Sequence, residues 1–280
     1  MKQVESLRYD VIFKKAFGDK HIFTAFVHDI LGIDLEIDGV EKDKQYNPTI
    51  GSVDTKFDLY AEDKKNRVIV DIQHRRLPDH YQRFLYYHCA ALLEQLVKSD
   101  DYRPKLKVFT IVVLTSGDRH KTDVSVIDFD PKNLKGEPLG EIDHKVIFIC
   151  PKYLQNDTPI EYHEWLEAIE DSLDEEVDES HYKNPEIKRI FNMIEKDKVT
   201  PTERALMFDQ HANEEFEQEV FDKWKEAGFD EGYIEAQKEG EDKLKNELRK
   251  AAINLKNHSS LTEEEIASMI GLSLDEVKNL

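Results

Sequence analysis

Apolar residues in the first half of the chain change repeatedly between helical and strand spacing. Residues 6–32 carry an apolar face at helical spacing with a break near residue 18, which predicts two helices ending at a C-cap on Gly32. A further helix is predicted from 79 to 97. The alternating or continuous apolar runs predict strands at 35–42, 57–61, 68–73, 107–115 and 146–150. The expected product is a mixed β-sheet flanked by helices, an α/β (α+β) fold.

Beyond residue 159 the strand signals end and only helical spacing remains. Helices are predicted at 160–173, 185–194 and 202–224, and the acidic run 174–179 predicts a solvated link. A very polar helical stretch follows. The chain therefore divides into a sheet-containing core, an all-α extension and a polar helical tail, with expected bounds of 1–157, 158–228 and 229–280.

The last residues of the tail have a more definite pattern. Thr262 to Glu265 fits a capping box, and Gly271 separates two short apolar stripes. Two short helices around a glycine turn resemble a helix-turn-helix, which would make the protein a DNA-binding regulator. A DNA-reading surface should be basic, whereas this tail is acidic, so a contact within the chain or in a homo-oligomer is favoured.

The strands at 57–61 and 68–73 contain carboxylates inside otherwise apolar runs. Asp71 and Gln73 lie two apart on one strand and therefore share a face. If the two strands pair, Asp58 and Asp71 come together at one end of a sheet. An unpaired buried charge is costly, so such groups are paired, protonated or bound to a metal ion.

Two interpretations of this carboxylate pair stay open. Two carboxylates and a backbone carbonyl near Ile72 are hard oxygen ligands, which suit Mg²⁺ or Mn²⁺. A neighbouring Gln73 could then orient a water molecule. Alternatively, Asp58 and Asp71 are strand-end residues paired with Arg75 or Arg76. Both arginines could also steer nucleic acid.

The flanking helices carry further candidates. Arg83 and Tyr87 are four apart and share a helix face, where the planar guanidinium suits a phosphate. Core packing is the simplest role for Tyr86. Asp10 opens the first helix, where a carboxylate stabilises the helix start by capping and electrostatics, and a role at the site is the alternative.

The arrangement of Asp58 followed by Asp71-x-Gln73 resembles the signature of PD-(D/E)XK nucleases. The stretches 10–17 and 81–87 resemble one branch, the recombination-promoting nuclease or transposase family. The resemblance implies a PD-(D/E)XK core with catalytic Asp58, Asp71 and Gln73, and it implies supporting roles for Asp10, Arg83 and Tyr87. Two positions depart from the signature: Gln73 stands where lysine is usual, and Asp71 where this branch usually has glutamate.

Composition narrows the class of protein further. The chain has 39% hydrophobic residues and a formal net charge of −20, of which residues 1–150 carry −2 and residues 151–280 carry −18. The core half is thus nearly neutral, and the acidic half should limit non-specific binding to phosphate backbones. No apolar run is long enough for a membrane span and the N-terminus lacks a signal-peptide core, so a cytoplasmic protein is expected.

Several enzyme classes lack their sequence motifs. No Walker loop, GxGxxG, GxSxG or HExxH motif is present, and the two cysteines, Cys89 and Cys150, predict reduced core thiols. The sequence and the resemblance together predict a Mg²⁺- or Mn²⁺-dependent DNA endonuclease. The competing hypothesis is an interaction protein that keeps the fold without the activity.

Overall fold

The computed structural model describes residues 1–46, 55–74, 80–95 and 104–226, together with 253, 255–256, 262–270 and 274–278. These residues fall into two compact units, 1–212 and 213–280. Within the described chain, no helix combines the length and the apolar character needed to cross a bilayer.

A six-stranded mixed sheet forms the centre of the first unit. Its spatial order is β2-β3-β4-β5-β7-β6. The strands span Glu41–Tyr46 (β2), Thr55–Glu62 (β3), Asn66–Gln73 (β4), Lys107–Leu114 (β5), Val124–Asp128 (β6) and Lys145–Ile149 (β7). β2, β3 and β4 run antiparallel, β4, β5 and β7 run parallel, and β6 closes the far edge antiparallel to β7. Parallel strands need cover on both faces, which explains the long apolar runs of β4 and β5.

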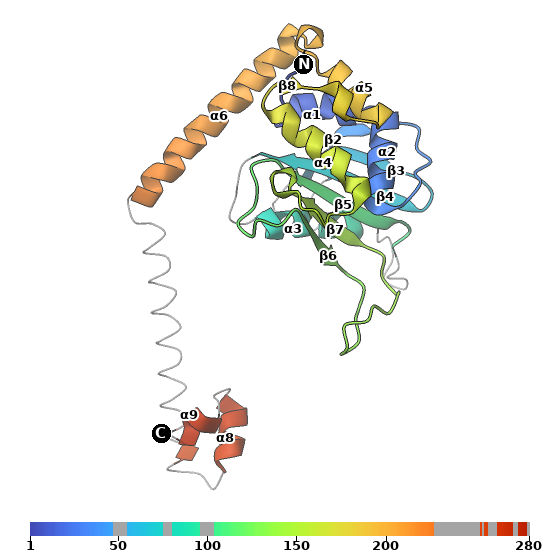
Figure 1. Ribbon diagram of the computed structural model, residues 1–280. Helices are drawn as coiled ribbons and strands as arrows, with labels where there is room; N and C mark the ends of the chain where they lie inside the picture. The colour runs from blue at the N-terminus through green and yellow to red at the C-terminus, as the bar shows by residue number, and fades with distance from the viewer. Residues whose placement is uncertain are drawn as a thin grey trace. The chain divides into compact units, whose positions relative to one another are not determined.

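Helices cover the two faces of the sheet unequally (Figure 1). The larger core lies between the sheet and four helices, α1 (Asp10–Phe17), α2 (Lys20–Leu31), α4 (Ile160–Leu173) and α5 (Pro185–Met193). The opposite face packs on α3 (His80–Leu93) through Phe84, Tyr87 and Ala91, and Phe129 and Tyr153 add to the same core. Residues of α4 and α5 therefore belong to the same buried core as the sheet, and the predicted bounds of 1–157, 158–228 and 229–280 stay a prediction.

Local sequence explains where the first helices begin and end. The Asp19 carboxylate accepts hydrogen bonds from the backbone N–H groups of His21 and Ile22 at the start of α2. Gly32 ends α2 with φ of 67°, in the left-handed region that glycine tolerates, and this confirms the predicted C-cap. Asp10, by contrast, does not cap α1. Tyr9 is the N-cap and makes no side-chain capping bond.

The remaining elements are short, except for α6. A two-stranded pair joins β1 (Lys2–Gln3) to β8 (Glu176–Val177). Three 3₁₀ turns occupy Pro151–Tyr153, Glu179–His181 and Lys196–Lys198, and α6 spans Pro201–Glu226. In the second unit, α8 (Glu263–Ile270) and α9 (Leu274–Lys278) pack through Ile266, Ala267 and Val277. This helix pair agrees with the predicted tail; its use in DNA binding or oligomer contacts stays a prediction.

Three expectations from sequence are wrong. The first large strand begins at Glu41 and not at residue 35, because Ile37 is buried against the helical core without a strand partner. The acidic run 174–179 is not a solvated link, since Val177 is buried in the β1–β8 pair. Tyr86 is 38% exposed and not a core residue, because α3 turns only its Phe84–Tyr87–Ala91 side to the sheet.

The two buried cores of the sheet contain only residues up to Met207 among those described. A chain ending at residue 228 should therefore retain one cooperative thermal unfolding transition, with a melting temperature close to that of the full chain. Circular dichroism on both chains measures this. A truncated chain that melts without cooperativity would show that the tail belongs to the core.

Candidate active site

The hairpin of β3 and β4 brings Asp58 and Asp71 together. The ladder between these strands runs to the pair Leu59 and Val70, so that the next residues in register are Asp58 and Asp71. At that point the carboxylates of the two aspartates accept the backbone hydrogen bonds in place of backbone carbonyls. The backbone N–H of Asp58 donates to Asp71 Oδ1 (3.1 Å), and that of Ile72 donates to Asp58 Oδ2 (3.0 Å). Each carboxylate is thus fixed by the backbone of the opposite strand.

Asp71 lies on the face of the sheet that α3 covers. Ile69, two residues earlier, packs in the α3 core, and side chains two apart on a strand share a face. Gln73 follows on the same face as the last residue of β4, and its backbone carbonyl accepts the N–H of Thr115 (3.1 Å). Gln73 therefore lies beyond Asp71, at the carboxyl end of β4.

Arg83 and Tyr87 of α3 form a pair, as their spacing predicts. Arg83 Nε donates to the Tyr87 hydroxyl (3.3 Å), and the guanidinium carbon lies 5.4 Å from the centroid of the Tyr87 ring. Tyr87 packs its ring against Phe57 of β3 (6.0 Å between centroids), whereas Arg83 is exposed. The exposed guanidinium of Arg83 could therefore reach a phosphate, and its contacts with Tyr87 fix its orientation. Arg75 and Arg76 lie outside the described residues.

A buried lysine that the sequence did not single out joins the carboxylates. Lys14 is 7% exposed, and its Nζ donates to Asp10 Oδ2 (2.7 Å) and Asp43 Oδ1 (2.7 Å) and lies 3.1 Å from Asp58 Oδ1. Asp10 is thus an ion-pair partner inside the site. The i,i+4 spacing of Asp10 and Lys14, beside apolar Phe13, was the signal that could have identified the lysine.

Asp43 reaches this cluster through an unusual backbone conformation. It stands opposite Asp58 in the β2–β3 register and has φ of 56°, a left-handed value that aspartate tolerates better than most residues. Its carboxylate also pairs with Lys56 (2.7 Å). The irregular point in β2 therefore coincides with the point where β3 delivers Asp58 to the site.

Burial and mutual repulsion raise the pKa values of both central carboxyls. Burial and the charge of Asp10 raise the pKa of Asp58 to about 6, against the opposing effects of Lys14 and the Ile72 N–H group. Burial and the Asp58 charge raise the pKa of Asp71 well above its usual range. Burial disfavours the Lys14 ammonium, but Asp58, Asp10 and Asp43 outweigh it and raise its pKa. Strongly perturbed neighbouring groups of this kind are concentrated at functional sites.

The donor set offers oxygen atoms that a metal ion could use. Among the described residues, Asp71 Oδ2 and Asp10 Oδ1 are buried carboxylate oxygens without a hydrogen-bond partner. Unsatisfied buried oxygens in a negatively charged cluster suit a hard divalent cation. The described part of the chain contains no ready-made group of three or more His, Cys, Asp or Glu side chains arranged for a metal. Metal binding by Asp58, Asp71 and Ile72 therefore stays a prediction.

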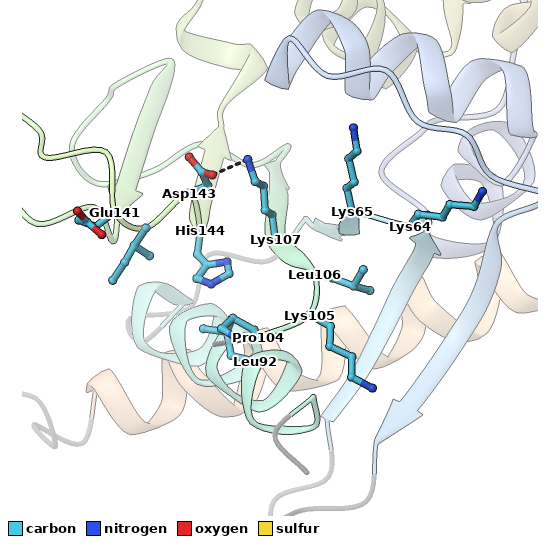
Figure 2. Close-up of a pocket in the computed structure, with 11 residues that line it drawn as sticks. Lys64, Lys65, Leu92, Pro104, Lys105, Leu106, Lys107, Glu141, Asp143 and His144 are labelled. Atoms are coloured by element: carbon cyan, nitrogen blue, oxygen red, sulfur yellow. Dashed lines mark ion pairs between the residues drawn. The ribbon is translucent and has the colours of Figure 1, made fainter. Parts of the chain in front are cut away.

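A separate pocket lies at the opposite end of the parallel strands (Figure 2). Its volume is about 680 Å³, and it is lined by the turn before β4, the start of β5 and the residues before β7. The ammonium groups of Lys64, Lys65, Lys105 and Lys107 lie far apart in Figure 2, and Lys107 pairs with Asp143 (2.5 Å). The lysines do not converge on one point, so this pocket carries none of the chemistry of the carboxylate site.

A mixed sheet with helices on both faces and two linked acidic residues on adjacent strands define a PD-(D/E)XK-like nuclease fold. The family model described as PD-(D/E)XK nuclease family transposase matches residues 7–223, and the chain belongs to this family. The match begins just before α1 and runs into α6. No curated protein and no solved structure matches the chain significantly.

The ion cluster generates a prediction about stability. Lys14→Met leaves three carboxylates without their cation. Because Asp58 is largely buried but Asp10 and Asp43 are 44% and 47% exposed, it should lower the free energy of unfolding of the metal-free protein by about 2–4 kcal/mol. Lys56→Met is the matched control, because Lys56 is 51% exposed and, among the described residues, forms an ion pair with Asp43 only. It should cost about 0–1 kcal/mol. Urea denaturation measures both values. Equal costs would contradict a central role of Lys14.

Proposed function

We propose that this protein is a metal-dependent DNA endonuclease that hydrolyses phosphodiester bonds at the Asp58–Asp71 site. The observation that carries the proposal is the reciprocal hydrogen bonding of these carboxylates across β3 and β4, which leaves Asp71 Oδ2 buried without a partner among the described residues. Family membership supports the same function. The oxygen donors support Mg²⁺ or Mn²⁺ as the cofactor.

Each residue has a distinct proposed role. Asp58, Asp71 and the backbone carbonyl of Ile72 hold the ion, which when bound would lower the pKa of a coordinated water and stabilise charge on the scissile phosphate. Gln73 orients the attacking water but cannot take its proton. The side chain of Arg83 contacts a phosphate of the substrate, and Tyr87 keeps the guanidinium in place by its hydroxyl and ring.

The distribution of charge is compatible with a DNA substrate despite the net charge of −20. Residues 1–150, which supply every proposed site residue, carry a net charge of only −2, and residues 151–280 carry −18. The acidic half restrains non-specific association with phosphate backbones, so affinity should be selective and sensitive to salt. An interaction protein without catalysis is the competing function, and Asp71 in place of glutamate and Gln73 in place of lysine favour it.

Plasmid cleavage with Mg²⁺ or Mn²⁺ tests the proposed activity. Asp71→Ala removes a metal ligand and should reduce cleavage by about 100-fold or more. Asp71→Asn should do the same at nearly constant volume. Asp71→Glu should keep activity, because the longer carboxylate reaches the same ion. Arg83→Ala should lose about tenfold, since it removes one phosphate contact and not the ion.

Asp34→Ala is the matched control for these variants, because it removes a carboxylate that is 91% exposed. Its cleavage rate should equal that of the wild type. Equal cleavage by the wild type and Asp71→Ala would place the activity at another site or in a contaminant. A folded wild type that cleaves no DNA with either metal would favour the interaction protein.

The raised pKa of Asp58, about 6, generates a second prediction. Below that pH Asp58 binds a proton, which an incoming cation must displace, so metal affinity should fall as pH falls. We expect the increase in melting temperature on adding Mg²⁺ to be clearly larger at pH 7.5 than at pH 5.0. An ordinary aspartate, with a pKa near 3.9, would stay ionised over this range. An equal increase at both pH values would therefore contradict the raised pKa.

A further inference from the structure

The carboxylate cluster already contains a cation of its own. Three carboxylate oxygens, from Asp10, Asp43 and Asp58, lie within 3.1 Å of Lys14 Nζ, as many as an ammonium group has protons. The lysine side chain is 7% exposed, so water contributes little to solvating the charge. The ammonium group therefore occupies the position on which these carboxylates converge.

We propose that Lys14 fills one of two cation positions in this site, so that the wild-type site takes only one divalent ion, beside Asp71. The inference rests on the proposed metal-dependent function and deepens it. Lys14 is a positioning residue here: its ammonium holds Asp10, Asp43 and Asp58 in place and excludes a second ion by occupancy and by charge.

The charges of the cluster support a single ion. With Asp10, Asp43, Asp58 and Asp71 ionised, and with Lys14 and Lys56 as the cations paired to them, the cluster has a formal charge of −2. One divalent ion neutralises that charge, whereas a second would leave the cluster with a charge of +2. Asp10 and Asp43 are 44% and 47% exposed, so an excess charge is most unfavourable at the less exposed Asp58 and Asp71.

The unsatisfied oxygens support a place for the divalent ion. Asp58 Oδ1 faces Lys14 and Asp58 Oδ2 accepts the Ile72 N–H, while Asp71 Oδ1 accepts the Asp58 N–H. Of these four oxygens, only Asp71 Oδ2 is unused among the described residues. Asp71 therefore offers a free acceptor without contacting Lys14, whereas the other unpartnered oxygen of the cluster, Asp10 Oδ1, belongs to a carboxylate whose second oxygen pairs with Lys14.

The sequence is consistent with Lys14 in one cation position and a divalent ion in the other. Strand β4 ends at Gln73, so the strand itself supplies no ammonium group beside Asp71. The helix α1 supplies one instead, from the face of the sheet opposite to α3. A lysine on a helix and carboxylates on three elements need the folded sheet to meet.

The test counts Mn²⁺ ions bound per full-length chain by calorimetric titration and by electron paramagnetic resonance of the free ion. The wild type should bind one ion, which Asp71→Asn should abolish. Lys14→Met should bind one ion more than the wild type, because the vacated position is surrounded by three carboxylates. Lys56→Met, which removes an exposed cation from Asp43, should leave the number unchanged.

An unchanged number of ions in Lys14→Met, or two ions at the carboxylates of the wild type, would overturn the inference. If the wild type binds no ion, the proposed metal-dependent function and the single ion beside Asp71 both fail. The number of ions in Lys14→Met then decides only whether Lys14 occupies a cation position. If Lys14→Met is unfolded without metal, saturating Mn²⁺ should restore its circular dichroism spectrum. A variant that Mn²⁺ cannot refold would also overturn the inference.

Discussion

One buried ammonium group holds together the part of the molecule on which the site depends. Lys14 Nζ lies within 3.1 Å of carboxylates from α1, β2 and β3, which would otherwise repel one another. The desolvation of such charges costs several kcal/mol each, and only close pairing offsets that cost. The same contacts fix how α1 lies against the sheet, so fold and site share one electrostatic constraint.

Regular backbone pairing between β3 and β4 ends where the site begins. Beyond Leu59 and Val70, the carboxylates of Asp58 and Asp71 accept the backbone N–H groups of the opposite strand. This exchange orients both side chains without a loop, because each is attached to a strand that is packed on both faces. A site built on strands in this way is rigid, at the cost of a raised pKa for both carboxyls.

The two faces of the sheet make different contributions to the site. The four-helix face delivers Asp10 and Lys14 on α1, whereas the α3 face delivers Arg83 and Tyr87. Asp71 lies on the α3 face and is linked to Asp58, which contacts Lys14. Lys14 and Arg83 therefore lie on opposite faces of the sheet, with the strands that carry the carboxylates between them.

Sequence alone determined the class of fold and the central pair. The apolar runs of β4 and β5, the period of β3 and the glycine at residue 32 predicted elements that the structure contains. Register placed Asp58 beside Asp71 once the hairpin was assumed. Only the tertiary structure revealed Lys14 and Asp43, buried Val177 in a strand pair, and exposed Tyr86. The physical reason is separation along the chain: local spacing encodes periodicity and turns, whereas Lys14 meets Asp43 and Asp58 only after α1, β2 and β3 have packed.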